Sequence, residues 1–259
     1  VRDQNGNIEI AGVALGLTEN VDHWSDILGL LLKQNGADIL KKSEENNEKI
    51  KDVLLYYINF YSDKNRPWDE VQPNSTDLFA SGKLAFYIAP SWRVFNLDDK
   101  NPNLPFEITT IPQLPIPDTG NLTDIHWATY WVEAVNSKSK HQAEAWKFLE
   151  FLASKESLQK MYTAASDTRR FGEIYPRKSL GETLKNNPKL KPFIDSAESG
   201  FTESGYLSSR TFDDGLNTEL SKYFGDAINS IVKNNSDPET VMVTLNNGLD
   251  QVIQKYQLQ

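Results

Sequence analysis

The sequence predicts an α/β protein in which short strands alternate with amphipathic helices. The central observation is the stretch at residues 76–115, where a short helix closed by Gly82 leads into the apolar run LAFYIA at residues 84–89. A glycine after a helical turn supplies the left-handed position that ends helices, and such an apolar run is typical of a buried strand. A short helix that carries Trp92 and a second predicted strand at residues 106–111 follow. Ligands of α/β sheets bind at strand ends, and Trp92 lies just past one.

Amphipathic helices account for most of the remaining chain. Apolar residues at positions i, i+3, i+4 and i+7 mark the buried face of a helix. This spacing predicts helices at about residues 24–35, 44–61, 140–153, 155–163, 215–233 and 238–256. Residues that can cap a helix N-terminus precede most of them: Asp22, Ser43, Ser154, Asp213 or Asp214, and Asp237. The carboxylates of Asp98 and Asp99 are assigned to a solvated loop.

An aromatic segment at residues 125–135, IHWATYWVEAV, is predicted to be a strand. Strand alternation puts Trp127 and Trp131 on one side and Tyr130 on the other. This density of rings fits either a core strand or a binding platform, and spacing alone favours the core.

The composition argues against several functional classes. With 259 residues, of which 39% are hydrophobic, the chain can form one large domain or two smaller ones. A net charge of −9 argues against a nucleic-acid surface. The absence of cysteine excludes disulfides, thiol catalysis and cysteine metal sites. The sequence has no apolar run of about 18 residues that would span a membrane.

A search for catalytic and cofactor motifs finds almost nothing. The sequence contains no G-x-S-x-G elbow, phosphate-binding glycine loop, dinucleotide fingerprint or H-E-x-x-H pattern. The three histidines are far apart and have no ligand spacing around them. No cofactor and no metal are therefore predicted. Whether Asp22, Glu133 and Asp213 converge as an acid/base pair does not follow from sequence, so an enzyme is unsupported.

Four stretches, taken in order, resemble the extracellular solute-binding proteins of ABC transporters, in the sugar-binding, maltose-binding-protein-like family. The most specific is FASGKLAFYIAPSW at residues 79–92, followed by PQLP at residues 112–115. The segment WATYWVEAVNSKSKHQAEAWKFLEFLASKESLQ, with its Ala-Trp-x-Phe-Leu pattern, comes next in weight. The opening AGVALGLTENVDHWSDILGLLLKQNGA and the later RRFGEIYPRKS also fit. The resemblance covers nearly the whole chain and rests on order and spacing.

The resemblance implies a two-lobe, periplasmic-binding-protein-like fold of class α/β. Residues 1–122 and 176–259 would form the second lobe, and residues 123–175 would contribute a crossing strand and helices to the first. Family members carry a substantial segment, including a signal or lipoprotein peptide, before the region that matches Val1. The chain is thus expected to be an N-terminally truncated fragment with one lobe only partly present. We then expect exposed apolar faces on the helices at residues 140–163, including Trp146, Leu149 and Met161.

The resemblance also implies a binding function, in which no covalent bond is made or broken. Two lobes would close on a carbohydrate in the cleft between them, and the membrane permease subunits of the transporter would recognise the closed form. The protein would be extracytoplasmic and monomeric. Aromatic faces suit the C–H patches of a sugar, and polar side chains satisfy its hydroxyls, which are costly to desolvate alone.

Candidate ligand contacts are carried over from the resemblance. Trp92 is the strongest, because it lies at the corner where the family commonly places a stacking aromatic ring. The others are aromatic or polar residues at comparable positions: Asp22, His23, Trp24, Trp127, Tyr130, Trp131, Arg170 and Asp213. Each has an ordinary structural explanation as well: Trp24 fits a core stripe, Asp213 a helix cap and Arg170 a surface ion pair.

Two alternatives remain open from the sequence. A binding protein of the same architecture for a non-sugar solute would display charge rather than stacked rings in its cleft. A glycan-processing enzyme would need two carboxylates about 5–10 Å apart across a cleft.

Overall fold

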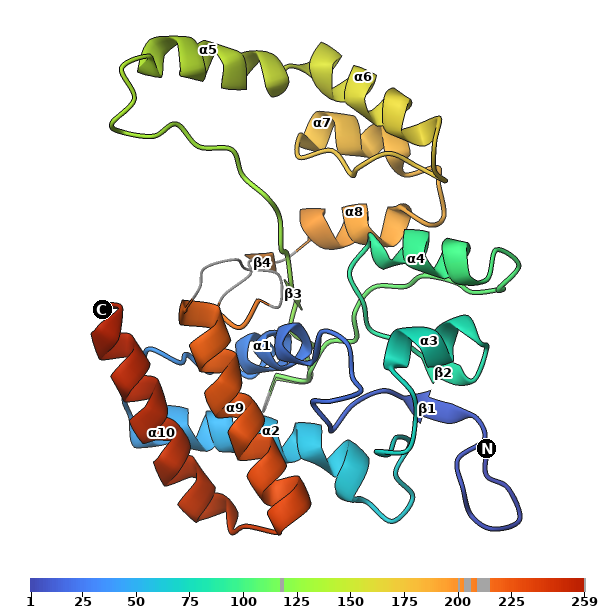
Figure 1. Cartoon of the computed structure of the whole chain (residues 1–259), viewed down its shortest axis with the longest axis vertical. Coiled ribbons are helices and arrows are strands. Elements are labelled where there is room, and N and C mark those ends of the chain that lie inside the picture. The colour runs from blue at the N-terminus through green and yellow to red at the C-terminus, as the bar shows by residue number, and fades with distance from the viewer. Residues whose placement is uncertain (117–118, 200, 203–205, 209–214, 259) are drawn as a thin grey trace.

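The computed structural model describes residues 1–116, 119–199, 201–202, 206–208 and 215–258. The described chain has a C-shaped outline in which two groups of helices are joined by thin connections (Figure 1). One group contains α1 (Trp24–Gln34), α2 (Glu44–Ser62), α9 (Leu216–Asn234) and α10 (Pro238–Lys255). The other contains α5 (Gln142–Leu152), α6 (Lys155–Ser166), α7 (Lys178–Gly181), η1 (Glu182–Leu184) and α8 (Lys191–Glu198).

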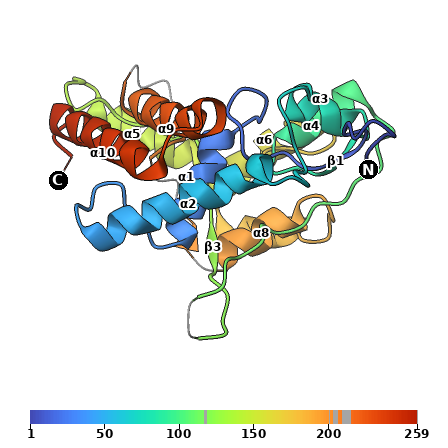
Figure 2. The same ribbon diagram turned by 90° about the horizontal axis from the view of Figure 1, so that it is seen from below.

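The remaining elements are short. They are β1 (Ala11–Val13), α3 (Ser75–Ala80), β2 (Leu84–Phe86), α4 (Arg93–Lys100), β3 (Ile125–His126) and β4 (Phe201–Thr202). Seen from below, α2 lies across α1, and α9 and α10 run side by side beyond it (Figure 2).

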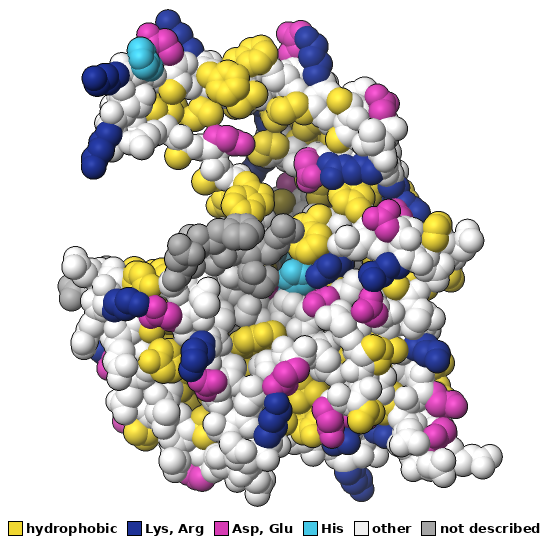
Figure 3. All heavy atoms as spheres, viewed as in Figure 1, with side chains coloured by type: hydrophobic (Ala, Val, Ile, Leu, Met, Phe, Trp, Pro, Cys, Tyr) yellow, Lys and Arg dark blue, Asp and Glu magenta, His cyan; other side chains and the backbone are white. Residues whose placement is uncertain are grey.

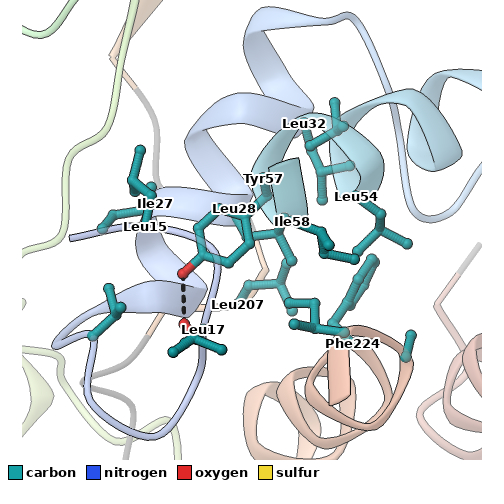
Figure 4. Close-up of a cluster of buried hydrophobic side chains, with 14 of the residues drawn as sticks. Leu15, Leu17, Ile27, Leu28, Leu32, Leu54, Tyr57, Ile58, Leu207 and Phe224 are labelled. Carbon is teal, nitrogen blue, oxygen red and sulfur yellow. Dashed lines mark hydrogen bonds between the residues drawn. The ribbon is translucent and has the colours of Figure 1, made fainter. Parts of the chain in front are cut away.

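The main hydrophobic core lies among α1, α2, α9 and α10, where the apolar stripes read from the sequence face one another. Tyr57 of α2 is fully buried, and its hydroxyl donates a 2.8 Å hydrogen bond to the carbonyl oxygen of Leu17 (Figure 4). Burial raises the pKa of Tyr57 far above its ordinary value. Leu28 and Phe224 close the same cluster from α1 and α9.

Two short parallel strand pairs are present among the described residues. In the first, β1 pairs with β2, with Ala11 opposite Leu84 and Val13 opposite Phe86. In the second, β3 pairs with β4, with Ile125 opposite Phe201. The strand predicted at residues 84–89 is confirmed in its first half, and Gly82 has the expected left-handed conformation at φ 76.

Two predicted strands are wrong. Residues 106–111 form no strand, and Phe106 and Ile108 pack instead on a small second core around Val94 and Phe171. The strand predicted at residues 125–135 ends after His126. An apolar or alternating pattern specifies an extended chain, whereas a strand also requires a neighbour to complete its hydrogen bonds.

Several helix boundaries follow the predicted capping residues, one capping prediction is wrong and one is not tested. The side chains of Ser43, Ser154 and Asp237 accept hydrogen bonds from the first turns of α2, α6 and α10, as predicted. Asp22 does not cap α1, because His23 occupies the N-cap position and the Asp22 carboxylate binds other groups. The capping candidates Asp213 and Asp214 lie outside the described residues.

Asp98 and Asp99 lie in α4 and not in a loop, so that prediction is also wrong. The carboxylate of Asp98 accepts a 2.6 Å ion-pair contact from Arg170 Nε, which explains an acidic residue on this side of the helix.

The α5–α6 pair carries large apolar side chains that face outward. Trp146 is 55% exposed and Met161 is 48% exposed, while Leu149 is half-buried. No residue of α5 is buried. The predicted exposure is therefore confirmed for Trp146 and Met161, whereas Leu149 is partly covered.

Trp127, the residue that follows β3, contacts helix α1. Its indole Nε1–H donates a 2.9 Å hydrogen bond to Asp26 Oδ1, and its ring lies on the helix at Gly29. A Cβ placed at Gly29 would lie 2.5 Å from the Trp127 ring. A glycine within a helix costs about 1 kcal/mol relative to alanine, and this close approach supplies a reason for it.

Replacing Gly29 by alanine should therefore destabilise the protein despite the better helix propensity of alanine. We expect the free energy of unfolding to fall by about 1–3 kcal/mol, the usual cost of overpacking, as measured by urea denaturation. Gly181→Ala is the matched control, because a Cβ there would lie an ordinary 3.8 Å from Ile194. A Gly29→Ala protein as stable as the Gly181→Ala protein would contradict this packing argument.

Candidate functional site

Trp92 lies at the N-terminal end of α4 and is half-buried. The guanidinium of Arg93 lies over its ring, with Cζ 4.6 Å from the ring centroid. The His23 imidazole contacts the same indole edge-on, at 5.3 Å between centroids and an interplanar angle of 76°. The guanidinium therefore covers one face of the indole.

The Arg93 guanidinium is held from several sides. Its Nη2 lies 3.3 Å from Asp22 Oδ2 and 3.0 Å from His23 Nε2, and its Nη1 donates to Asn96 Oδ1 at 3.3 Å. Its Nε is buried and has no hydrogen-bond partner in the described part of the chain. These contacts draw together residues that lie about 70 positions apart.

Asp22 is the acceptor at the centre of this group. Its Oδ1 accepts a 2.8 Å hydrogen bond from Asn74 Nδ2, and its Oδ2 accepts from the Thr76 hydroxyl as well as from Arg93. Partial burial acts to raise the pKa of the Asp22 carboxyl, but the bonds from Asn74 and Thr76 and the charge of Arg93 lower that pKa below its ordinary value. Asp22 is therefore ionised at neutral pH.

His23 is fixed in position and tautomer. It has φ 59, in the left-handed region that costs most residues energy and is kept only where surroundings impose it. Its Nδ1 lies 3.3 Å from Asp26 Oδ2. Because Arg93 can only donate, His23 Nε2 accepts and Nδ1 carries the proton toward Asp26. Asp26 in turn accepts from Trp127, which links the segment after β3 to Trp92.

Tyr87 closes the group on the side of β2. Its hydroxyl lies 2.6 Å from Thr76 Oγ1. Since Thr76 donates to Asp22, Tyr87 donates to Thr76. Burial is the main cause that raises the pKa of Tyr87, so its hydroxyl keeps its proton. The group combines an aromatic face, a cation, carboxylates and hydroxyls.

The other sequence-predicted residues lie elsewhere. Trp24 is half-buried against α9, where a Cβ added at Gly225 would lie 3.4 Å from its ring. Tyr130 and Trp131, in the segment after β3, are 71% and 66% exposed. Arg170 pairs with Asp98. Asp213 lies outside the described residues.

Sequence reasoning named Trp92, Asp22, His23 and Trp127 but missed Arg93, Asp26, Thr76 and Tyr87. Arg93 follows Trp92 directly, and an arginine next to an aromatic residue is a signal for cation–π stacking. Nothing local marks Thr76 or Tyr87, because their partners lie far away in sequence.

The surface offers hollows away from this group as well. One of about 290 Å³ lies between the start of α2 and α10, near Lys42 and Asp250, and one of about 410 Å³ lies near Asp77 and Lys100. Neither is lined by Trp92 or its partners. On a larger scale, the molecule is hollowed on the side of the α5 arm that faces the rest of the chain (Figure 3).

Metal chemistry and membrane insertion find no support in the described residues. No group of three or more histidine, aspartate or glutamate side chains there could hold a metal ion. No described helix is both long and apolar enough to cross a membrane.

The family model for bacterial extracellular solute-binding proteins matches residues 3–192. The chain belongs to this family. Membership implies a location outside the cytoplasm, and it groups the chain with binding proteins and not with enzymes. A search of curated proteins found no match.

Solved structures of binding proteins share the fold. One is a cyclo/maltodextrin-binding protein complexed with maltotetraose, which is 18% identical, with a TM-score of 0.62 over 95% of this chain and 60% of that one. The maltose/maltodextrin-binding domain MalE of Bdellovibrio bacteriovorus, bound to maltotriose, is 17% identical, with a TM-score of 0.60 over 97% of this chain and 62% of that one.

A third is UgpB of Mycobacterium tuberculosis in complex with glycerophosphocholine, which is 15% identical, with a TM-score of 0.59 over 98% of this chain and 60% of that one. The chain thus spans about 60% of the length of these structures. The matches confirm the predicted α/β fold of the periplasmic-binding-protein type.

The ionised state of Asp22 gives a pH-dependent stability. At neutral pH, Asp22→Asn should lower the free energy of unfolding by about 1–3 kcal/mol, the usual effect of weakening hydrogen bonds to a charged group. The pKa of Asp22 is lower in the folded than in the unfolded chain, so this stabilisation is complete above the ordinary value of 3.8 and is lost as the pH falls through the folded value.

Chemical denaturation of both proteins between pH 3 and pH 7 measures this difference, which should narrow on the acid side. A difference in the free energy of unfolding that stays constant down to pH 3, or that grows there, would contradict the assigned charge state of Asp22.

Proposed function

We propose that this chain binds a carbohydrate with Trp92 as its stacking surface. The observation that carries the proposal is the half-buried indole at the start of α4, with Arg93 over one face and hydrogen-bonding side chains beside it. An aromatic face buries the C–H patches of a sugar ring, and polar neighbours replace the water lost by its hydroxyls. The maltotetraose and maltotriose in the similar structures support a sugar as the ligand.

We further propose that the ligand binds between two lobes and that the protein delivers it to ABC transporter permease subunits. On this view, residues 1–122 and 176–259 belong to one lobe and residues 123–175 to the other, and the protein works as a monomer, free or lipid-anchored outside the cytoplasm. Tyr130 and Trp131 are then further aromatic contacts from the other lobe, because both are exposed shortly after β3.

A non-sugar solute is the second candidate, and the glycerophosphocholine in one similar structure favours it. The charges around Trp92 argue the other way. The carboxylate of Asp22 pairs with the guanidinium of Arg93, and the carboxylate of Asp26 contacts His23, so the group suits a neutral ligand better than an anion. Calorimetric titration with maltotriose, maltotetraose, mannobiose and glycerophosphocholine in parallel separates the two candidates.

Trp92→Ala should weaken binding of the preferred sugar by about 1–3 kcal/mol, the usual scale for losing an aromatic contact. The melting temperature should change little, because the side chain is half-buried at the surface and fills little core volume. Titration calorimetry and a melting curve on the same variant measure both quantities. Trp146→Ala on α5 is the matched control and should bind as the wild type does.

The opposite pattern would contradict the proposal. A core role for Trp92 predicts a loss of about 3–5 kcal/mol in stability from the cavity, with binding lost only as the fold is lost. Failure of the wild-type chain to bind any of these sugars at millimolar concentration would likewise count against carbohydrate binding.

A further inference from the structure

The carboxylate of Asp22 accepts hydrogen bonds from several donors of the protein itself. One carboxylate oxygen accepts from Asn74 at the N-cap of α3, and the other accepts from Thr76 and Arg93. The backbone N–H of Asp22 donates to Ser75 Oγ at 2.9 Å. The carboxylate thus already has three donors from the protein, so most of its acceptor sites are used within the protein.

Asp22 pairs with the Arg93 guanidinium, which lies over the Trp92 indole. The Arg93 side chain would lose its charged acceptor without Asp22, since its other contacts are the neutral acceptors His23 Nε2 and Asn96 Oδ1. A guanidinium that stacks on an indole also limits the rotation of that ring. Asp22 in this way acts on Trp92 without touching it.

We propose that Asp22 is a positioning residue for the Trp92 stacking surface: by pairing with Arg93, whose guanidinium lies over the ring, it fixes the orientation of the indole. The proposal deepens the carbohydrate-binding function and rests on it for its effect on affinity. The structural part of the proposal is that Asp22 fixes the position of Trp92 through Arg93. This part can be tested without any ligand.

The ligand-free test uses the indole N–H signals of the tryptophans in a ¹⁵N-labelled chain 1–259, with Trp92→Phe identifying the Trp92 signal. Asp22→Asn should shift or broaden that signal, and Arg93→Lys should do the same. Asp77→Asn is the matched control, because it removes an exposed α3 carboxylate that pairs with Lys100 of α4 at 2.7 Å. It should leave the Trp92 signal in place.

A double variant tests whether Asp22 acts through Arg93. If it does, adding Asp22→Asn to Arg93→Lys moves the Trp92 signal no further, whereas independent effects add. A Trp92 signal unmoved by Asp22→Asn in a folded chain, or a fully additive double variant, overturns the proposal. Should Asp22→Asn not fold, Arg93→Lys decides: an unmoved Trp92 signal in that variant overturns it as well.

Calorimetric titration with maltotriose and maltotetraose provides the functional arm. Asp22→Asn should bind about 2- to 30-fold more weakly, the range found for residues that act through a network, and Asp77→Asn should match the wild type. Weaker binding with an unmoved Trp92 signal would make Asp22 a direct contact and overturn the positioning role. Wild-type affinity in Trp92→Ala would instead refute the proposed function, and the Trp92 signal would then decide positioning alone.

Discussion

The ion pair between Asp22 and Arg93 is the interaction on which the candidate site depends. It ties the loop before α1 to the start of α4, and the additional donors Asn74 and Thr76 bring in the start of α3. Partial burial makes such a pair costly to break, because removing one partner leaves an uncompensated charge. The arrangement of Trp92, His23 and Arg93 is therefore a consequence of where the core helices place Asp22.

The chain from Trp127 to Tyr87 explains how distant segments share one site. Trp127 donates to Asp26, His23 contacts both Asp26 and Arg93, and the Asp22–Thr76–Tyr87 bonds continue to β2. The segment after β3 is thus connected to the aromatic surface by polar contacts, and Arg93 Nε is the one atom of this network that is buried without a hydrogen-bond partner among the described residues. Hydrogen-bonded networks of this kind help to hold their members in one arrangement.

Sequence patterns predicted what depends on local chemistry. The helix faces follow from 3.6-residue spacing, and Ser43 marks the start of α2 because its side chain satisfies a free N–H there. The strand prediction for residues 106–111 was wrong because a strand needs a partner strand, which the periodicity of the sequence does not specify. Asp22 looks like a helix cap locally, yet its carboxylate bonds donors more than 50 positions away. The aromatic half of the site was therefore foreseen, and most of its polar half was not.

The central claim is that a sugar stacks on the indole of Trp92. Nuclear Overhauser effects between the C–H protons of bound maltotriose and the protein's aromatic protons test it most directly. The account predicts contacts from the sugar ring to the Trp92 indole, absent when Trp92 is replaced by phenylalanine. Contacts confined to other rings, such as Tyr130 and Trp131, with none at Trp92, would contradict it.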